Sequence, residues 1–150
     1  MFFRHSNEMW SGFPELVAGV LSVQGVASTV DVEDRVAGYH AIATERLARG
    51  PESEMAEIQA WRRGFSKMGL KPTQYRCASE ALLRRFRQDG ALPRLHPLVD
   101  LCNAISIAFA IPVAVFDLSK ISAISKCGML LATNPIRPFP ARLSIRTQGR

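Results

Sequence analysis

The chain has 150 residues, 47% of them hydrophobic and 21% charged, which is the size and composition of one ordinary soluble globular domain. Disordered and fibrous proteins are excluded by this composition, and no apolar run reaches the roughly 18 residues that a membrane-spanning helix needs. The first residues, MFFRHSNEMW, include Arg4 and His5 and do not form a signal peptide. We therefore expect a cytoplasmic protein with one folded domain, residues 1–126, and a basic, proline-containing tail at residues 127–150.

Residues 16–26, LVAGVLSVQGV, form the first predicted element. The segment is short, rich in valine and apolar on both alternations, which is typical of a central strand. Asp31 is placed to cap a helix that runs to about Arg49, and Gly50 is a suitable stop for it.

A second helix is predicted from about Ser53 to Met68, with Gly69 as its end. Its apolar residues recur at steps of three or four, so one face packs against the core. Trp61 and Phe65 belong to that apolar face, and we interpret them as core residues rather than as platforms for stacking bases.

A third helix is predicted to follow Ser79, its expected cap, and to stop at Gly90. Its apolar residues Leu82, Leu83 and Phe86 should be buried, whereas its arginines should project outward.

The fourth predicted helix opens with Pro97 and runs over residues 98–110. It is apolar nearly all round, so the fold should enclose it. Asn103 is one of its polar exceptions, and a buried amide must bond either another protein group or a ligand. Cys102 has no evident base nearby and is interpreted as a structural thiol. Residues 111–117 then read as another short strand.

Charge is unevenly divided along the chain. Residues 1–61 hold nine acids and four bases, a net −5, and residues 62–94 hold nine bases and two acids, a net +7. Such a basic segment indicates a polyanionic partner. The alternative is a solvated helix surface in which Glu80 and Arg84 form an ordinary i,i+4 pair. The residues to which we assign RNA binding are Arg62, Arg63, Lys67, Arg84, Arg85, Arg87 and Arg94.

Three ordered stretches carry a resemblance to a known family. AWRRGFSKMGLKPTQYRCASEALLRR, LPRLHPLVDLCNAIS and IPVAVFDLSKI resemble the tRNA-editing module of the phenylalanyl-tRNA synthetase beta subunit, and still more the free-standing proteins built from that module alone. The resemblance implies an α+β fold with helices packed on a mixed sheet. It also implies a site that hydrolyses a mischarged aminoacyl-tRNA ester, with tyrosine on the phenylalanine tRNA as the default substrate.

The resemblance also suggests which residues line that site. Asn103 matches the asparagine of the family's VD-x-x-N element and would line the pocket, while Asp100 would fix the adjoining backbone. His96, in the preceding loop, would contact the acceptor end or the amino acid. No catalytic residue is assigned beyond these candidates, and no metal or cofactor is expected, because His5, His40 and His96 lack metal-ligand spacing.

Two departures from the family pattern leave a second hypothesis open. Ala114 stands where many synthetases have histidine, and the residues after Lys126 do not align with the family and contain no acid. We therefore expect a domain that is incomplete or divergent at its C-terminus. The alternative function is a non-catalytic RNA-binding or vestigial fragment of the same family, with tRNA or aminoacyl-tRNA as the partner in either case.

Overall fold

The computed structural model describes residues 4–120 and 126–127, which divide into two compact units. In the first unit, β1 (Arg4–His5) pairs in parallel with β2 (Lys126–Cys127). The short helix α1 (Asn7–Gly12) follows β1, and its N-cap Ser6 accepts a hydrogen bond from the Met9 N–H. The described part of this unit is therefore small and carries none of the predicted site residues.

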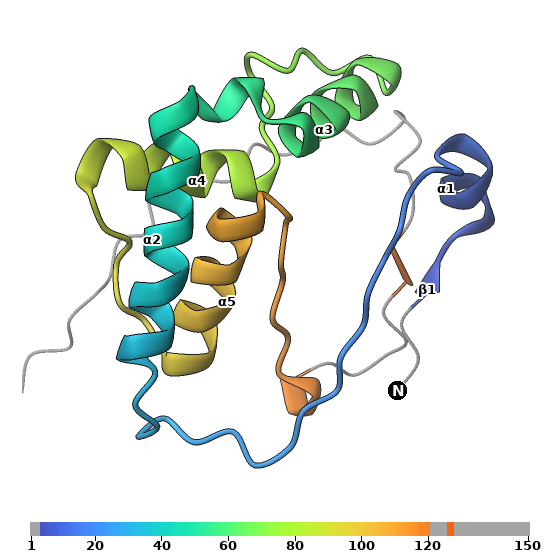
Figure 1. Cartoon of the computed structure of the whole chain (residues 1–150). Helices are drawn as coiled ribbons and strands as arrows, with labels where there is room; N and C mark the ends of the chain where they lie inside the picture. The colour runs from blue at the N-terminus through green and yellow to red at the C-terminus, as the bar shows by residue number, and fades with distance from the viewer. Residues whose placement is uncertain (1–3, 121–125, 128–150) are drawn as a thin grey trace, which may run out of the picture. The chain divides into compact units, whose positions relative to one another are not determined.

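The second unit, residues 19–120, is built from four helices of 12 residues or more and two single 3₁₀ turns. Figure 1 shows α2 running alongside α5, with α4 lying across the pair. In chain order the elements are α2 (Glu33–Arg49), η1 (Glu52–Glu54), α3 (Ala56–Lys67), α4 (Ala78–Asp89), α5 (Pro97–Phe109) and η2 (Leu118–Lys120).

The core of this unit lies where α2, α3, α4 and α5 meet. Its buried residues come from all four helices and their connections, namely Ala43, Ile58, Cys77, Leu83, Phe86, Ile107 and Ala110. Trp61 and Phe65 are half-buried against this cluster, with ring centroids 6.1 Å apart. Both rings therefore belong to the core, as the helical periodicity predicted.

The helix boundaries follow local signals in the sequence. α2 ends at Arg49, α5 has Pro97 in its first turn, and Gly90 closes α4 in the left-handed conformation with φ 73°. These features confirm the four predicted helices to within a few residues. Asp31 accepts a hydrogen bond of 2.8 Å from the Glu33 N–H, although the N-cap position itself is Val32.

The predicted cap of α4 was wrong. The helix begins two residues earlier than expected, at Ala78, with Cys77 as N-cap, and Ser79 is fully buried inside the first turn. Its hydroxyl donates a 3.1 Å hydrogen bond to the Ala110 carbonyl at the end of α5. Ser79 therefore joins two helices instead of capping one.

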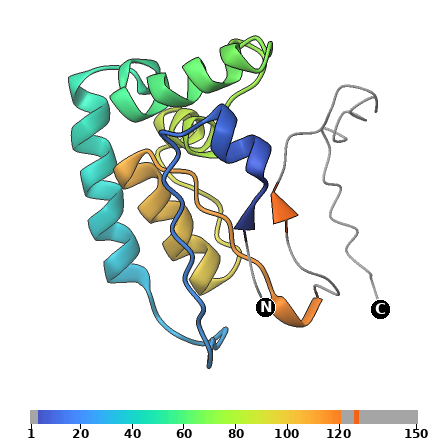
Figure 2. The ribbon, with the colours of Figure 1, turned by 90° about the vertical axis from the view of Figure 1, so that its right-hand side faces the viewer.

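The predicted mixed sheet was also wrong. Within the described residues, the only strand pairing is that of β1 with β2, and the second unit is helical. Residues 16–26 and 111–117 have no regular secondary structure, as the plain tube in Figure 2 shows. Val17 is 92% and Leu21 86% exposed. A β-prone segment becomes a strand only when another strand bonds to its backbone, and the described chain supplies none for these two.

Candidate functional site

Two of the three pocket candidates bind backbone at the start of α5. The His96 side chain caps the helix, because its Nδ1 accepts a 3.2 Å hydrogen bond from the Leu98 N–H. Asp100 Oδ1 accepts from the Leu95 N–H at 2.9 Å and from the His96 N–H at 3.4 Å. The loop before α5 is thereby fixed to the first turn of the helix. With Nδ1 acting as acceptor, the neutral His96 ring carries its proton on Nε2 and offers a donor there.

Asn103 differs from these two residues. Its side chain is half-buried, and its amide makes no hydrogen bond with any described residue. In α5 the spacings of three and four residues put His96, Asp100 and Asn103 on one stripe of the helix. This stripe continues to Ser106, whose buried hydroxyl donates a 2.7 Å bond to the Ile111 carbonyl. The described residues thus leave both the Asn103 amide and the Nε2–H of His96 available to a ligand.

Cys102 is a free, half-buried thiol beside Asn103. Burial raises the pKa of this thiol above its usual value, which lowers the fraction of reactive thiolate at neutral pH. The structural interpretation of Cys102 therefore fits its environment better than a nucleophilic one.

The basic residues assigned to RNA binding fall into two groups. Arg62, Arg87 and Arg94 each pair with an acid distant in sequence, and Arg85 pairs with Asp89 one turn along α4. Arg63 and Arg84 are exposed and form no ion pair with any described residue, and Lys67 is exposed as well. Except for Arg94, these residues lie on α3 and α4, and we call the exposed sides of these two helices that carry them the basic surface. Only part of its charge is uncompensated by described residues.

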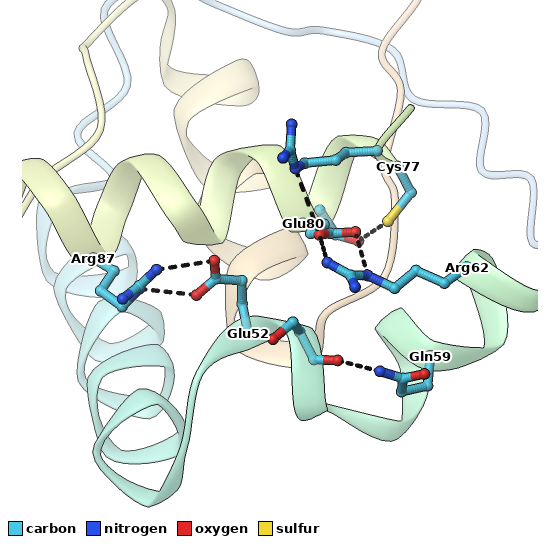
Figure 3. A network of polar contacts seen from close by, with 9 residues as sticks. Glu52, Gln59, Arg62, Cys77, Glu80 and Arg87 are labelled. Atoms are coloured by element: carbon cyan, nitrogen blue, oxygen red, sulfur yellow. Dashed lines mark hydrogen bonds and ion pairs between the residues drawn. The ribbon is translucent and has the colours of Figure 1, made fainter. Parts of the chain in front are cut away.

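A polar network joins η1, α3 and α4 beneath that surface, and Figure 3 shows it from close by. Glu80 is nearly fully buried and accepts two hydrogen bonds from Arg62, at 2.5 Å from Nη2 and 3.3 Å from Nε. Arg76 Nε lies 3.7 Å from the same carboxylate. The partners of Glu80 are therefore Arg62 and Arg76, and not Arg84, with which the sequence suggested an i,i+4 pair. The hydrogen bond to Glu80 raises the pKa of Arg62.

Glu52, in η1, is the second buried carboxylate of the network. Arg87 Nη2 donates to its Oε1 at 3.1 Å, and Arg87 Nε lies 2.9 Å from its Oε2. The second contact is an ion pair whose atoms are not aligned as a hydrogen bond, so Oε2 has no hydrogen-bond partner among the described residues. Two buried carboxylates thus pair with arginine side chains of α3, α4 and the segment before α4.

An exposed ion pair links the loop before α5 to the start of α2. Arg94 Nη1 donates to Glu33 Oε1, and this hydrogen bond lowers the pKa of Glu33 and raises that of Arg94. Both side chains remain exposed. Glu33 and Glu52 belong to the acidic first part of the sequence, and both pair with arginines of the basic segment. Acidic and basic residues that are far apart in the sequence are therefore neighbours in the folded protein.

Sequence reasoning missed Glu52, Glu80 and Arg76 as parts of this region. The available signal for Glu80 was its position as a lone acid among bases in residues 62–88. Nothing in the local sequence marked Glu52, because its partner Arg87 lies 35 residues away.

Among the described residues, no group of three or more His, Cys, Asp or Glu side chains could hold a metal ion. His40 packs against Phe86 with ring centroids 4.8 Å apart, and burial lowers its pKa. No described helix is both long and apolar enough to cross a membrane.

The helices and polar groups described so far define a helical domain with one basic surface and one apolar helix that carries a polar stripe. The B3/4 domain family matches residues 60–136, slightly more than half of the chain, and so covers both features. The chain belongs to this family, whose domain is found in the phenylalanyl-tRNA synthetase beta subunit.

This membership confirms the resemblance noted from the sequence. The match extends ten residues beyond Lys126, and the domain boundary placed there stays a prediction. Searches of curated proteins and of solved structures found no match.

Proposed function

We propose that this protein binds tRNA through the basic surface of α3 and α4 and hydrolyses a mischarged aminoacyl ester beside the start of α5. The observation that carries the proposal is the family match, which runs through all three helices and is associated with a tRNA-related protein. The Asn103 amide, which has no hydrogen-bond partner among the described residues, supports the second half of the proposal, because its donors and acceptor can bond a ligand.

The reaction is the addition of water to the ester carbonyl, followed by cleavage of the bond to the ribose oxygen. Its products are the free amino acid and the tRNA with its terminal hydroxyl restored. The chain would contribute donors rather than a nucleophile, namely the Asn103 amide and the Nε2–H of His96. Such groups lower the barrier by holding the ester in position and stabilising negative charge on the carbonyl oxygen. Cytoplasmic action on free tRNA is part of the proposal.

The default substrate is tyrosine on the phenylalanine tRNA. A site that bonds the tyrosine hydroxyl discriminates strongly against phenylalanine, because its polar groups would remain unpaired with the cognate side chain.

A non-catalytic tRNA-binding role is the second candidate, and one observation favours it. His96 Nδ1 and Asp100 Oδ1 both accept hydrogen bonds from the backbone. Both side chains therefore have a structural role in fixing the start of α5, which a domain that only binds tRNA needs as well.

The test is deacylation of a panel of mischarged tRNAs, with tyrosine on the phenylalanine tRNA included. The wild-type chain should release the amino acid, and Asn103→Ala should lose this activity while its affinity for tRNA stays within about twofold. Asn7→Ala, an exposed amide on α1, is the matched control and should behave as wild type. A folded wild-type protein that binds tRNA and releases no amino acid would establish the non-catalytic role.

A further inference from the structure

We propose that Glu80 and Glu52 are positioning residues that hold Arg62, Arg76 and Arg87 as a fixed row of phosphate-binding guanidinium groups. The ligand class is the phosphodiester backbone of RNA. This inference rests on the RNA-binding half of the proposed function and not on the hydrolytic half. Of these five residues, Arg76, Glu52 and Glu80 were not among the residues assigned from the sequence.

The first argument is which edge of each guanidinium the protein uses. Arg62 directs Nε and Nη2 at Glu80, and Arg87 directs the same two nitrogens at Glu52. A guanidinium has five N–H donors, so each arginine retains both hydrogens of Nη1 and one of Nη2. Those remaining donors form the fork that matches two phosphate oxygens.

The second argument is the difference in burial between the two sides of each pair. The Glu80 and Glu52 side chains are 2% and 6% exposed, whereas Arg62, Arg76 and Arg87 are 26%, 34% and 48% exposed. The carboxylates lie too deep to meet a ligand, so the arginines present their outer sides to solvent. Three guanidinium groups against two carboxylates leave one net positive charge, which attracts an anion.

The third argument is conformational entropy. A free arginine side chain loses rotamer freedom when a phosphate fixes it. The buried carboxylates of Glu80 and Glu52 already fix Arg62 and Arg87. These two side chains therefore lose less conformational entropy when they bind a phosphate. Arg63 and Arg84, on the same helices, are exposed and have no ion pair with a described residue, so they supply charge without this preorganisation.

Substitution by lysine separates the two kinds of arginine. Lysine keeps the positive charge, but its ammonium group cannot bond a carboxylate through one edge and a phosphate through another. We expect Arg62→Lys and Arg87→Lys to weaken binding of tRNA about tenfold, as loss of a charge-assisted hydrogen bond would. Arg63→Lys and Arg84→Lys, the matched controls, should stay within about twofold.

The measurement is fluorescence anisotropy of labelled tRNA at several salt concentrations, with the thermal midpoint of each variant recorded alongside. The inference predicts lower affinity with an unchanged salt slope, because the number of positive charges is constant. Equal affinities for all four folded lysine variants would overturn it, and so would a wild-type chain that binds no tRNA. A chain that binds tRNA with this pattern but releases no amino acid would leave the inference standing and refute only the hydrolytic proposal.

A second measurement needs no variant and covers the case in which a substitution unfolds the protein. Pyrophosphate is titrated into the wild-type protein while the arginine Nε–H resonances are followed by NMR. Arg62, Arg76 and Arg87 should shift at lower pyrophosphate concentration than Arg63 and Arg84. Simultaneous shifts of all five resonances would contradict a preorganised row.

Discussion

The basic surface of α3 and α4 and the polar stripe of α5 satisfy their polar groups in opposite ways. Beneath the surface, Glu52 and Glu80 are buried and bonded to arginines, so much of the charge expected to meet RNA also holds the helices together. On the stripe, Asn103 has no described partner. The difference teaches that removing a polar side chain with a protein partner should lower the stability of the fold. Removing a polar side chain without a described partner should change only ligand binding.

Glu80→Ala should have the largest effect on stability. It leaves Arg62 and Arg76 without their shared carboxylate, and breaking a buried ion pair costs about 3 kcal/mol. The measurement is the free energy of unfolding from urea denaturation. Glu45→Ala is the control, because Glu45 pairs with Arg49 on the exposed side of α2, where such a pair contributes under about 0.5 kcal/mol. Similar losses for both variants would show that the Glu80 network does not stabilise the fold.

Ser79→Ala should have an intermediate effect. The substitution removes the buried hydrogen bond to the Ala110 carbonyl and leaves that acceptor unpaired, which costs about 1–2 kcal/mol. Urea denaturation again measures the loss, with Ser66→Ala, an exposed position on α3, as the reference. A change no larger than that of Ser66→Ala would mean that the hydrogen bond contributes nothing net.

His40 should make a smaller, pH-dependent contribution. Burial lowers the pKa of His40 in the folded protein, so the unfolded chain binds more protons as the pH falls below about 6.5. Stability from the neutral, packed ring is present above that pH and declines below it. Comparing unfolding free energies at pH 8 and pH 5 for wild type and His40→Phe checks this, and the variant should lose less stability on acidification. An identical decline in both proteins would assign the pH dependence to other groups.

Asn103→Ala should have the smallest effect on stability, under about 0.5 kcal/mol, because it removes no hydrogen bond to a described residue. Its thermal midpoint should therefore match that of wild type. A loss similar to that of Ser79→Ala would show that Asn103 has a structural partner and would remove the basis for its role in ligand binding.

The helices could be predicted from the sequence because their signals are local. Pro97 and Gly90 mark boundaries through their own backbone preferences, and apolar spacing alone placed Trp61 and Phe65 in the core. The same holds for Asp100, whose bonds to the preceding backbone span only four and five residues.

The strands and the ion pairs could not be predicted because they depend on contacts distant in sequence. Residues 16–26 have the composition of a strand, yet pairing requires a neighbour that composition does not reveal. The pairs of Arg87 with Glu52 and of Arg94 with Glu33 span 35 and 61 residues. Dividing the charges by position in the chain therefore overstated the free positive charge, and only the fold showed which arginines were already paired.

The two segments without regular secondary structure, residues 16–26 and 111–117, have a practical consequence. Val17, Leu21 and Phe116 leave large apolar side chains in water, and such surface binds hydrophobic dyes and promotes association between molecules. A dye such as anilinonaphthalene sulfonate, commonly used to detect loosely packed states, should therefore fluoresce with the native protein. Dye binding by this chain would report the exposed side chains of these segments and not a loss of helical packing. Thermal unfolding of the protein should therefore be followed by circular dichroism instead of dye fluorescence.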